Sequence, residues 1–447
     1  MKITALLGLL FVSLLCEGQV SGQQTKDHQL PLLRLEDVIE LTLSKNYGIR
    51  IARNDSAALA IEKSFSQEAV LPRLNAATGL LFNNNDQHQK FSDGAIRERK
   101  GIQSANTNAS LALNWTVFNG LRVYATRERA AALQQLGQLN VRNNLLNTVA
   151  EASNGYYAIV QQKQQLKAIE EQIQINQERV KLADYKLSIG AGTRPDLLQS
   201  KVDLNAQKAA QLEQLSTLQQ LKNELNTIMG RSIVDNFEVT DSIPFKPALS
   251  IVDLQENLDK TNLQLLVAQK NISLASSALK IQKADRWPML NFNSTYNFNL
   301  LDNKAVVNPF QPLFSRNNGF NYGITTSIPL FNNGITRRNI QQAQLNLKRE
   351  QLVFDNQKQQ VDLALVQAYN LYQAALQLLR LEEENMLLAR ENVQIVFEVY
   401  RLNSSTLIQL KEAQKSLQDA FTRLIRARFQ AKQAETELLR LKGTLLH

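Results

Sequence analysis

A segment near residue 290 alternates between two kinds of side chain with a period of two. From Pro288 to Leu300 the even positions form a mainly apolar face, and the odd positions after Met289 are Asn291, Asn293, Thr295, Asn297 and Asn299. That alternation predicts a β-strand with one apolar face and one amide-lined face. A polar face made almost entirely of Asn is expected for the wet interior of a membrane β-barrel. We therefore expect these four asparagines to face a lumen.

The same alternation recurs in three other segments. Residues 319–331 place Asn321 on the polar face, residues 107–118 alternate in the same way, and residues 72–83 repeat the pattern more weakly. Each predicted strand, including 288–300, has about the 9 to 11 residues that a tilted strand needs to cross a bilayer. Because a closed barrel needs about eight strands, four strands cannot close one. The chain is therefore predicted to oligomerise to complete a pore.

Long stretches without proline predict the helices. No proline occurs in 73–194 or 330–447, and both stretches are rich in residues that favour helices. We expect two long helices, at 121–189 and 335–402, and four shorter ones, at 35–70, 195–229, 250–286 and 404–442. A helix as long as the first two would span on the order of 100 Å. Two short helices placed end to end would match one long helix, which predicts a cylinder walled by helices.

Landmarks along the chain recur at a displacement of 213 to 216 residues. The matching pairs are Pro72 with Pro288, Phe118 with Phe331, and Gly230 with Gly443. This recurrence indicates an internal two-fold repeat, with copies at 35–230 and 250–443. Each copy is expected to run helix, strand, loop, strand, long helix, turn and helix, with the turns at 190–195 and 403–406. A linker at 231–249 joins the copies, and residues 444–447 form a tail. The expected fold class is therefore mixed membrane α+β, with strands in the membrane and long helices outside it.

The N-terminal region reads as a secretory signal peptide. An apolar run from Ile3 to Leu15 follows Lys2, which predicts a signal peptide over 1–22, cut after Gly22 or Gly18. An extended segment, 23–34, follows it. The only cysteine, Cys16, lies in the removed part, and Leu15 before it is too large for the usual lipidation signal. The mature chain is thus expected to contain no disulfide and no thiolate chemistry.

Charge and histidine content argue against nucleic-acid binding and catalysis. The net charge is +9, but Lys and Arg are interspersed with Glu and Asp along the helices, which favours solvated faces over a nucleic-acid footprint. The three histidines, His28, His88 and His447, are too dispersed for a catalytic triad or metal cluster. No Gly-rich phosphate loop is present, so we expect no enzyme activity, cofactor or metal. The remaining alternative is a structural envelope coiled coil or surface protein without channel activity, although no sustained heptad seam supports it.

The connections between strands set the orientation. Segments 84–105 and 302–318 are long and polar, as the extracellular loops of bacterial barrels are, so the helices are expected in the periplasm. Four aromatic residues fall where strands meet helices and are predicted to lie at the membrane interface: Trp115, Phe118, Trp287 and Phe331. Ordinary core packing is the alternative interpretation of these aromatics.

The order and spacing of these landmarks resemble the TolC-type family of outer-membrane efflux channels over the whole mature chain. The matching segments include the opening helix from Leu35 to Asn46, the Pro329–Gly334 segment, and the turns Gly190–Asp196 and Tyr400–Thr406. The resemblance implies a homotrimer in the lipid of the outer membrane, with a twelve-stranded barrel continued by a periplasmic helical barrel. It also implies two partners, a periplasmic adaptor and an inner-membrane transporter of the RND, ABC or MFS class. The chain would then be a passive exit duct for efflux or type I secretion. The number of twelve strands comes from the resemblance, because the residues alone allow eight, twelve or sixteen.

The resemblance also suggests roles for the turns at the periplasmic end. It implies adaptor docking by Gly190, Gly192, Thr193, Asn403, Ser404 and Ser405, although turn geometry alone also explains these residue types. It implies a gate made by Asp196, Tyr400, Gln409 and Glu412. Gln409 stands where the family usually has an acid, and Ser405 where it often has a base. We therefore expect a weaker gate than in members with both acids.

Overall fold

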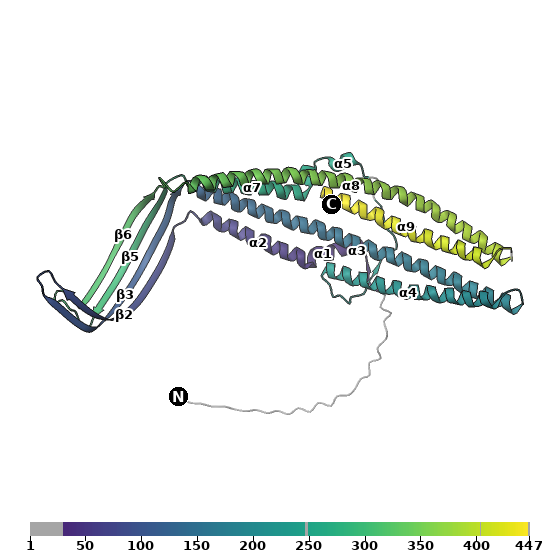
Figure 1. Ribbon diagram of the computed structural model, residues 1–447, viewed down its shortest axis with the longest axis horizontal. Coiled ribbons are helices and arrows are strands. Elements are labelled where there is room, and N and C mark those ends of the chain that lie inside the picture. Colours follow the sequence, from purple (N-terminus) through teal and green to yellow (C-terminus); the bar gives the residue numbers. More distant parts are fainter. Residues whose placement is uncertain (1–29, 246–248, 403, 446–447) are drawn as a thin grey trace, which may run out of the picture.

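The computed structural model describes residues 30–245, 249–402 and 404–445. The expected signal peptide, most of the 23–34 segment and the predicted docking residue Asn403 lie outside these ranges. The molecule is elongated, with a four-stranded sheet at one end and the helices at the other (Figure 1). The expected combination of a membrane-type sheet with long helices is therefore present. In the described ranges, none of the helices is both long enough and apolar enough to cross a membrane.

The sheet contains β2 (Arg73–Lys90), β3 (Ile96–Asn119), β5 (Met289–Asn303) and β6 (Phe314–Ser327). The order is β2-β3-β5-β6 and each neighbouring pair is antiparallel, so β2 and β6 form the two edges. The expectation of a loop over 84–105 is wrong, since β2 and β3 continue as a ladder up to a short turn at 91–95. The sequence of 84–105 is polar and does not alternate, so it gives no strand signal. Backbone hydrogen bonds between β2 and β3 hold this segment as a continuation of the two strands.

The second hairpin is closer to the predicted one. Its loop is shorter than the expected 302–318, because Asn303 is still in β5 and Phe314 already belongs to β6. β6 ends at Ser327 rather than at residue 331, two residues before Pro329. Proline has no backbone N–H to donate to a ladder, so it ends the strand.

Two helices of 67 residues each form the long axis, α3 (Arg122–Ser188) and α8 (Ile335–Arg401). Each turns back into a helix of 36 residues, α4 (Arg194–Met229) and α9 (Leu407–Lys442). Both short helices end at a glycine with positive φ, Gly230 and Gly443, as a left-handed C-cap requires.

The helices before the strands are interrupted, contrary to expectation. The stretch expected as one helix over 35–70 is α1 (Leu35–Lys45) and α2 (Tyr47–Glu68), divided at Asn46. The stretch expected over 250–286 is α5 (Ile251–Gln255), α6 (Leu258–Thr261) and α7 (Leu263–Ala284), with Asn262 before the last. Asn favours a cap over a helix interior, because its side chain competes for backbone donors.

A compact core lies around the middle of the helices. Strand β1 (Leu32–Leu33) pairs in parallel with β4 (Glu238–Val239), which belongs to the segment expected as a linker. Phe237 is fully buried, and it packs in one cluster with Tyr156 of α3 and Met229 of α4. The segment after α4 is thus fastened to the helices by apolar burial.

Candidate channel wall and periplasmic tip

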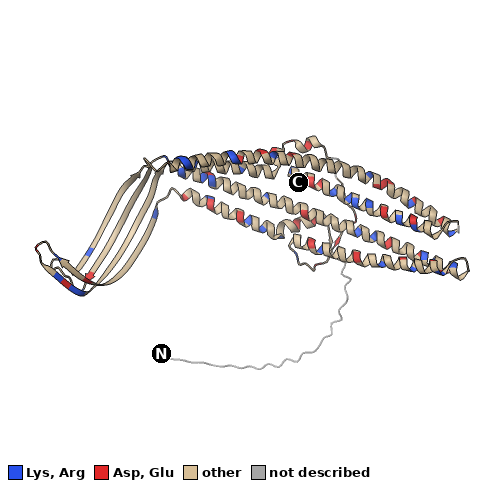
Figure 2. Ribbon diagram, in the orientation of Figure 1, with Lys and Arg blue, Asp and Glu red and all other residues tan. Residues whose placement is uncertain are grey.

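The sheet contains a wide band without charged side chains. No Asp, Glu, Lys or Arg occurs in 74–85, 101–119, 287–301 or 317–327. Figure 2 shows charge at the far end of the sheet and along the helices, with the strands between them almost free of it. A charged side chain facing lipid at the middle of a bilayer costs about 2 to 4 kcal/mol, so such a band suits a membrane span.

One face of the band collects the predicted lumen residues. Directly paired residues share a face of a sheet, and the register therefore groups five asparagines on one side: Asn291, Asn293, Asn297, Asn299 and Asn321. On this face the Thr116 hydroxyl donates to Oδ1 of Asn291 at 2.9 Å, linking β3 to β5. The face is polar and carries no charge.

The opposite face is apolar and open. Phe292 pairs with Trp115 on one side and with Ile324 on the other, and Tyr296 pairs with Phe320. Ile324 is 70% exposed in the single chain, and Phe320 is also exposed. A large apolar face left uncovered marks a surface that contacts lipid or protein.

The four predicted interface aromatics lie near the row where strands meet helices. Trp115 donates its indole N–H to the carbonyl oxygen of Val70 at 2.7 Å, which fixes its ring at the end of α2. A bulge after Thr116 pairs Phe118 with Leu290, on the apolar face. Trp287 and Phe331 are 61% and 86% exposed. These two are therefore not core residues of the single chain.

The two helical hairpins end in turns at the end farthest from the sheet (Figure 1). In the first turn Gly190 has a φ of 73°, which suits glycine. Thr193 caps α4, since its hydroxyl oxygen accepts from the Asp196 backbone N–H at 3.3 Å. The same hydroxyl donates to the Asp196 carboxylate at 2.7 Å. Gly192 packs against the end of α3, where an added Cβ would lie 3.0 Å from the Cβ of Lys186.

The second turn uses one predicted gate residue for a local purpose. Gln409 and Thr406 form a capping box at the start of α9, and the Gln409 side chain accepts from the Thr406 backbone N–H at 2.9 Å. Ser404 donates its backbone N–H to Val399 at 3.0 Å, Ser405 is half-buried, and Glu412 is exposed one turn into α9. In the single chain Gln409 therefore has a capping role.

Lys186 joins the ends of the two hairpins through Tyr400. Its ammonium lies 4.0 Å from the centre of the Tyr400 ring and donates to the Tyr400 carbonyl oxygen at 3.2 Å. Burial lowers the pKa of Lys186, and the charge of Asp196 partly opposes this change. Burial raises the pKa of the Tyr400 hydroxyl, and the negative charge of Asp196 raises it further. The hydroxyl is therefore protonated at neutral pH and can donate a hydrogen bond. The described part of this single chain contains no Tyr400–Asp196 hydrogen bond. The gate that the resemblance implies for these two residues stays a prediction for the assembled protein.

A polar network centred on Asp203 was not anticipated from the sequence. The buried Arg179 donates to Asp203 at 2.5 Å and to the side-chain oxygen of Gln414 at 3.0 Å. Lys411 lies 3.0 Å from Asp203, and Gln199 donates to it at 2.9 Å. These residues come from α3, α4 and α9, so the network ties one hairpin to the other.

Several groups compete to set the pKa of Asp203. Burial raises it, but hydrogen bonds from Gln199 and Lys411 and the charges of Arg179 and Lys411 outweigh burial. The net pKa is below its usual range, so the carboxylate is ionised at neutral pH. The sequence does contain a signal for the network. The cations Arg179 and Lys186 are seven residues apart on one helix, and the carboxylates Asp196 and Asp203 are seven residues apart on the next, antiparallel helix.

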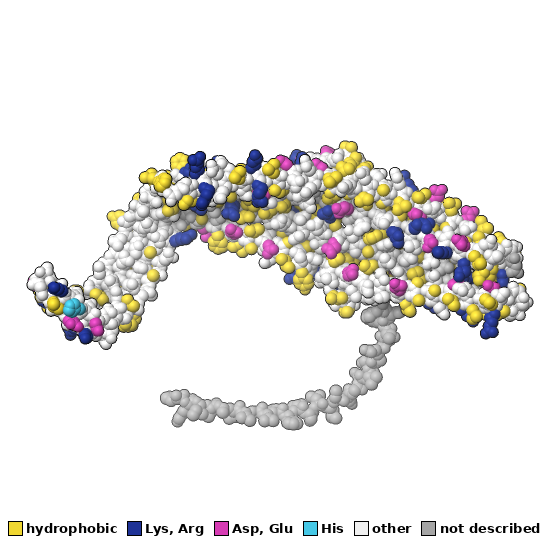
Figure 3. Space-filling model, in the orientation of Figure 1, with side chains coloured by type: hydrophobic (Ala, Val, Ile, Leu, Met, Phe, Trp, Pro, Cys, Tyr) yellow, Lys and Arg dark blue, Asp and Glu magenta, His cyan; other side chains and the backbone are white. Residues whose placement is uncertain are grey.

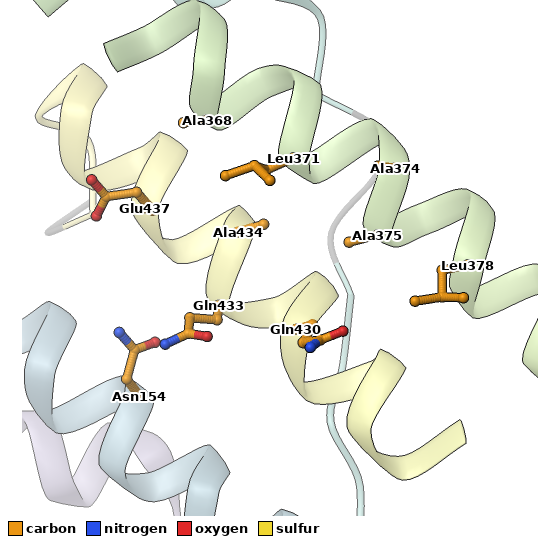
Figure 4. Close-up of a pocket in the computed structure, with 10 residues that line it drawn as sticks. All are labelled: Asn154, Ala368, Leu371, Ala374, Ala375, Leu378, Gln430, Gln433, Ala434 and Glu437. Carbon is orange, nitrogen blue, oxygen red and sulfur yellow. The ribbon is translucent and has the colours of Figure 1, made fainter. Parts of the chain in front are cut away.

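A groove of about 590 Å³ lies between α3, α8 and α9 (Figure 4). Leu371, Ala375 and Leu378 line its α8 side, while Gln433 of α9 and Asn154 of α3 approach one another across it. Its only charged group, Glu437, forms an ion pair with Arg440. Across the described ranges, no cluster of His, Cys, Asp and Glu could hold a metal ion.

Comparison with known proteins identifies the family. Residues 38–231 and 254–444 match the outer membrane efflux protein family. The chain is 20% identical over 401 residues to outer membrane protein TolC of Salmonella enteritidis, covering 88% of this chain and 79% of that one. It is also 20% identical to the proteases secretion protein PrtF of Dickeya chrysanthemi, over 75% of this chain and 72% of that one.

Solved structures show the same fold. The CmeC outer membrane channel of Campylobacter jejuni superimposes with a TM-score of 0.78 at 13% identity, over 92% of this chain and 86% of that one. The open MtrE outer membrane channel of Neisseria gonorrhoeae gives 0.73 at 16% identity, over 92% and 89%. With two matched segments that cover most of its length, the chain belongs to the outer membrane efflux protein family.

Proposed function

We propose that three copies of this chain close one twelve-stranded outer-membrane barrel, which a periplasmic helical barrel continues into an exit duct. Family membership makes the chain an outer-membrane channel protein for efflux or secretion, and not an enzyme. The observation that carries closure by several copies is the sheet, which has an uncharged band, one exposed apolar face and two edge strands, β2 and β6. The number three is what the family resemblance implies.

The edges of the sheet require further strands. Each edge presents backbone N–H and C=O groups that find no water inside a bilayer, and each such group left without a partner costs several kcal/mol. Edge β6 of one copy can pair with edge β2 of the next, because repeated head-to-tail contacts close a ring. Twelve strands follow when the ring contains three copies.

The helices present matching edges. Helix α8 exposes Leu381, Leu388 and Ile395 at intervals of seven residues, and α4 exposes Leu198 and Leu212. Spacings of seven are what a coiled-coil seam between neighbouring helices needs. We infer that α8 of one copy packs against the α2 and α4 edge of the next, which continues the ring below the membrane.

The internal repeat would give the helical wall of the duct a more regular structure, because both halves of the chain would form similar helical units. The supporting observation is that Asn46 and Asn262, at equivalent positions, each donate to a carbonyl at the end of a following short helix. Gly230 and Gly443 likewise each approach a carbonyl that an added Cβ would meet at 2.6 and 2.5 Å. Three chains would thus supply six similar helical units.

The tip is the proposed site of gating and of adaptor docking. Asp196 and Tyr400 lie near enough for the carboxylate to affect the pKa of the hydroxyl, and we assign them, with Gln409 and Glu412, to the gate. The turn residues Gly190, Gly192, Thr193, Ser404 and Ser405 are assigned to the adaptor, together with Asn403. An inner-membrane transporter of the RND, ABC or MFS class would supply the energy.

Conductance tests the proposal. The purified protein should insert into planar lipid bilayers and give stepwise ion currents. On gels it should change its migration on heating, because the unheated barrel runs as the slower trimer and the heated protein as single chains. A structural coiled coil would give neither currents nor heat-dependent migration, and that result would reject the duct. For the tip, Ser404→Cys should form cross-links with the adaptor, whereas Lys260→Cys, near the middle of the helices, should not.

A further inference from the structure

Basic side chains gather where the helices meet the sheet. Asn119, Met289 and Ser327 are paired across β3, β5 and β6, so the chain segments next to them lie at one height. Residues 122–129, 280–286 and 337–338 next to this row contain eight Lys or Arg and two acidic residues. Figure 3 shows dark-blue side chains over this end of the helices, next to yellow hydrophobic ones.

Three of these cations are used within the chain. Arg122 pairs with Asp285 at 2.7 Å and Lys280 with Glu128 at 2.7 Å. Arg127 donates to backbone carbonyls at the end of α2, including that of Ser66 at 3.3 Å. In this cluster both carboxylates are therefore already occupied by the first two cations.

The other five cations are exposed and have no carboxylate within ion-pair distance among the described residues. They lie on α3, α7 and α8 and in the turn that follows α7: Arg129, Lys283, Arg286, Arg337 and Arg338. Arg337 and Arg338 also lie in the first turns of α8, which contain no acidic residue. The positive end of the helix dipole disfavours cations there unless an anion is near. The local charge is thus unbalanced in a way that an external anion would correct.

An exposed apolar rim borders the same cations. Leu121 and Tyr124 are each 61% exposed, and Leu330 is 93% exposed. Long basic side chains beside apolar and aromatic groups are typical of a membrane interface, where the stem stays in the apolar layer and the charge reaches the headgroups. Because the helices are periplasmic, this rim faces the inner leaflet of the outer membrane, which consists of phospholipid.

We propose that Arg129, Lys283, Arg286, Arg337 and Arg338 form a binding surface for the phosphate groups of anionic phospholipids in that leaflet. Arg suits this role because its guanidinium donates two parallel hydrogen bonds to a phosphate. The surface would help to fix the depth and tilt of the barrel, since Lys and Arg at the membrane interface act as anchors. It would also favour anionic over zwitterionic lipid.

A lipid competition assay tests this surface. Fluorescent phosphatidylglycerol, added to the full-length protein in neutral detergent, should bind about tenfold more tightly than the matching phosphatidylethanolamine, and the preference should fall as salt is raised. The variant Lys283→Gln/Arg286→Gln/Arg337→Gln/Arg338→Gln should lose the preference while keeping its oligomeric state. The variant Arg286→Lys/Arg337→Lys/Arg338→Lys should retain most of it.

A matched control separates the surface from overall charge. Lys208→Gln/Lys260→Gln/Arg390→Gln/Lys415→Gln removes four exposed cations elsewhere on the helices and should keep the lipid preference. Equal binding of the two phospholipids to the unaltered protein would overturn the proposal. Loss of the preference in the control, stronger binding of lipid A than of phosphatidylglycerol, or dissociation of the assembly in the four-site variant would also overturn it. The last result would mean that these cations pair with a neighbouring chain.

Discussion

The side-chain amide of Asn46 donates to the backbone carbonyl of Ile228, 182 positions later, at 2.8 Å. The oxygen of the same side chain accepts from the Ile49 backbone N–H and caps α2. One residue thus begins α2 and satisfies a carbonyl at the end of α4, which aligns the two helices end to end. Asn262 makes the equivalent contact with the Leu441 carbonyl at 2.8 Å and caps α7.

Removing these amides should weaken the helical wall at its joints. We expect Asn46→Ala and Asn262→Ala each to lower the free energy of unfolding by about 1 to 3 kcal/mol, because a cap and a hydrogen bond are both lost, the bond being partly buried at Asn46 and buried at Asn262. Asn140→Ala, at an exposed site on α3, should change it by less than about 0.5 kcal/mol. Denaturant unfolding checks the difference. Equal effects at all three sites would mean that the joints do not depend on these contacts.

The two faces of the sheet should respond differently to charge. Tyr322→Arg, on the exposed apolar face, should cost about 2 to 4 kcal/mol near the middle of the membrane and reduce the assembled protein in membranes. Asn321→Arg, one residue away on the polar face, should assemble normally. The readout is the yield of assembled protein extracted from membranes. The reverse order of sensitivity would mean that the polar face contacts lipid.

The Asp203 network should stabilise the tip. Asp203→Asn leaves the buried Arg179 without its carboxylate, so the free energy of unfolding should fall by about 3 kcal/mol. The control Asp184→Asn changes an exposed carboxylate that has no ion pair among the described residues, and it should change the free energy of unfolding by less than about 0.5 kcal/mol.

The same network gives a pH dependence. Because folding lowers the pKa of Asp203, its contribution is complete above the usual carboxyl pKa of 3.8 and is lost as the pH falls through the native value. The stability gap between the unaltered protein and Asp203→Asn should therefore be constant near neutral pH and shrink in acid. A gap that widens in acid would contradict the assignment of an ionised Asp203.

The proposed gate can be opened by removing its two hydrogen-bonding groups. An Asp196–Tyr400 link between hairpins would contribute about 1.5 to 3 kcal/mol when charge-assisted, and three copies would add to the bias toward closure. Asp196→Ala/Tyr400→Phe should then raise single-channel conductance and leave the yield of trimer unaltered. The single change Thr193→Ala serves as a control, because it removes the hydrogen bonds of Asp196 within the turn but keeps the Asp196 carboxylate and the Tyr400 hydroxyl. Its conductance shows how much loss of the cap alone contributes. Unchanged conductance in the double variant would exclude both residues from the gate.

Periodicity in the sequence predicted the sheet well because a bilayer imposes strict rules. The alternation at Phe292 and Asn293 is the pattern expected for a strand with lipid on one side and water on the other, and the register confirms which residues share a face. The extension of β2 to Lys90 could not be predicted, because the residues beyond the membrane band are polar on both faces. Only pairing with β3 holds them as a strand.

The tip was harder to predict, because its contacts join elements far apart in the sequence. Asp196 and Thr193 could be found from turn chemistry, which is local. The contact of Arg179 with Gln414 spans 235 positions and depends on how the hairpins pack. The helix expected over 35–70 places Asn46 in its interior, since the role of this residue is visible only when Ile228 lies beside it.

Native mass spectrometry of the full-length protein in detergent decides whether the protein assembles as a trimer. Four strands with two open edges cannot be stable alone in a bilayer, so we expect one species with the mass of three chains. A folded monomer that inserts into bilayers and conducts ions would contradict it, as would an assembly of two or four chains.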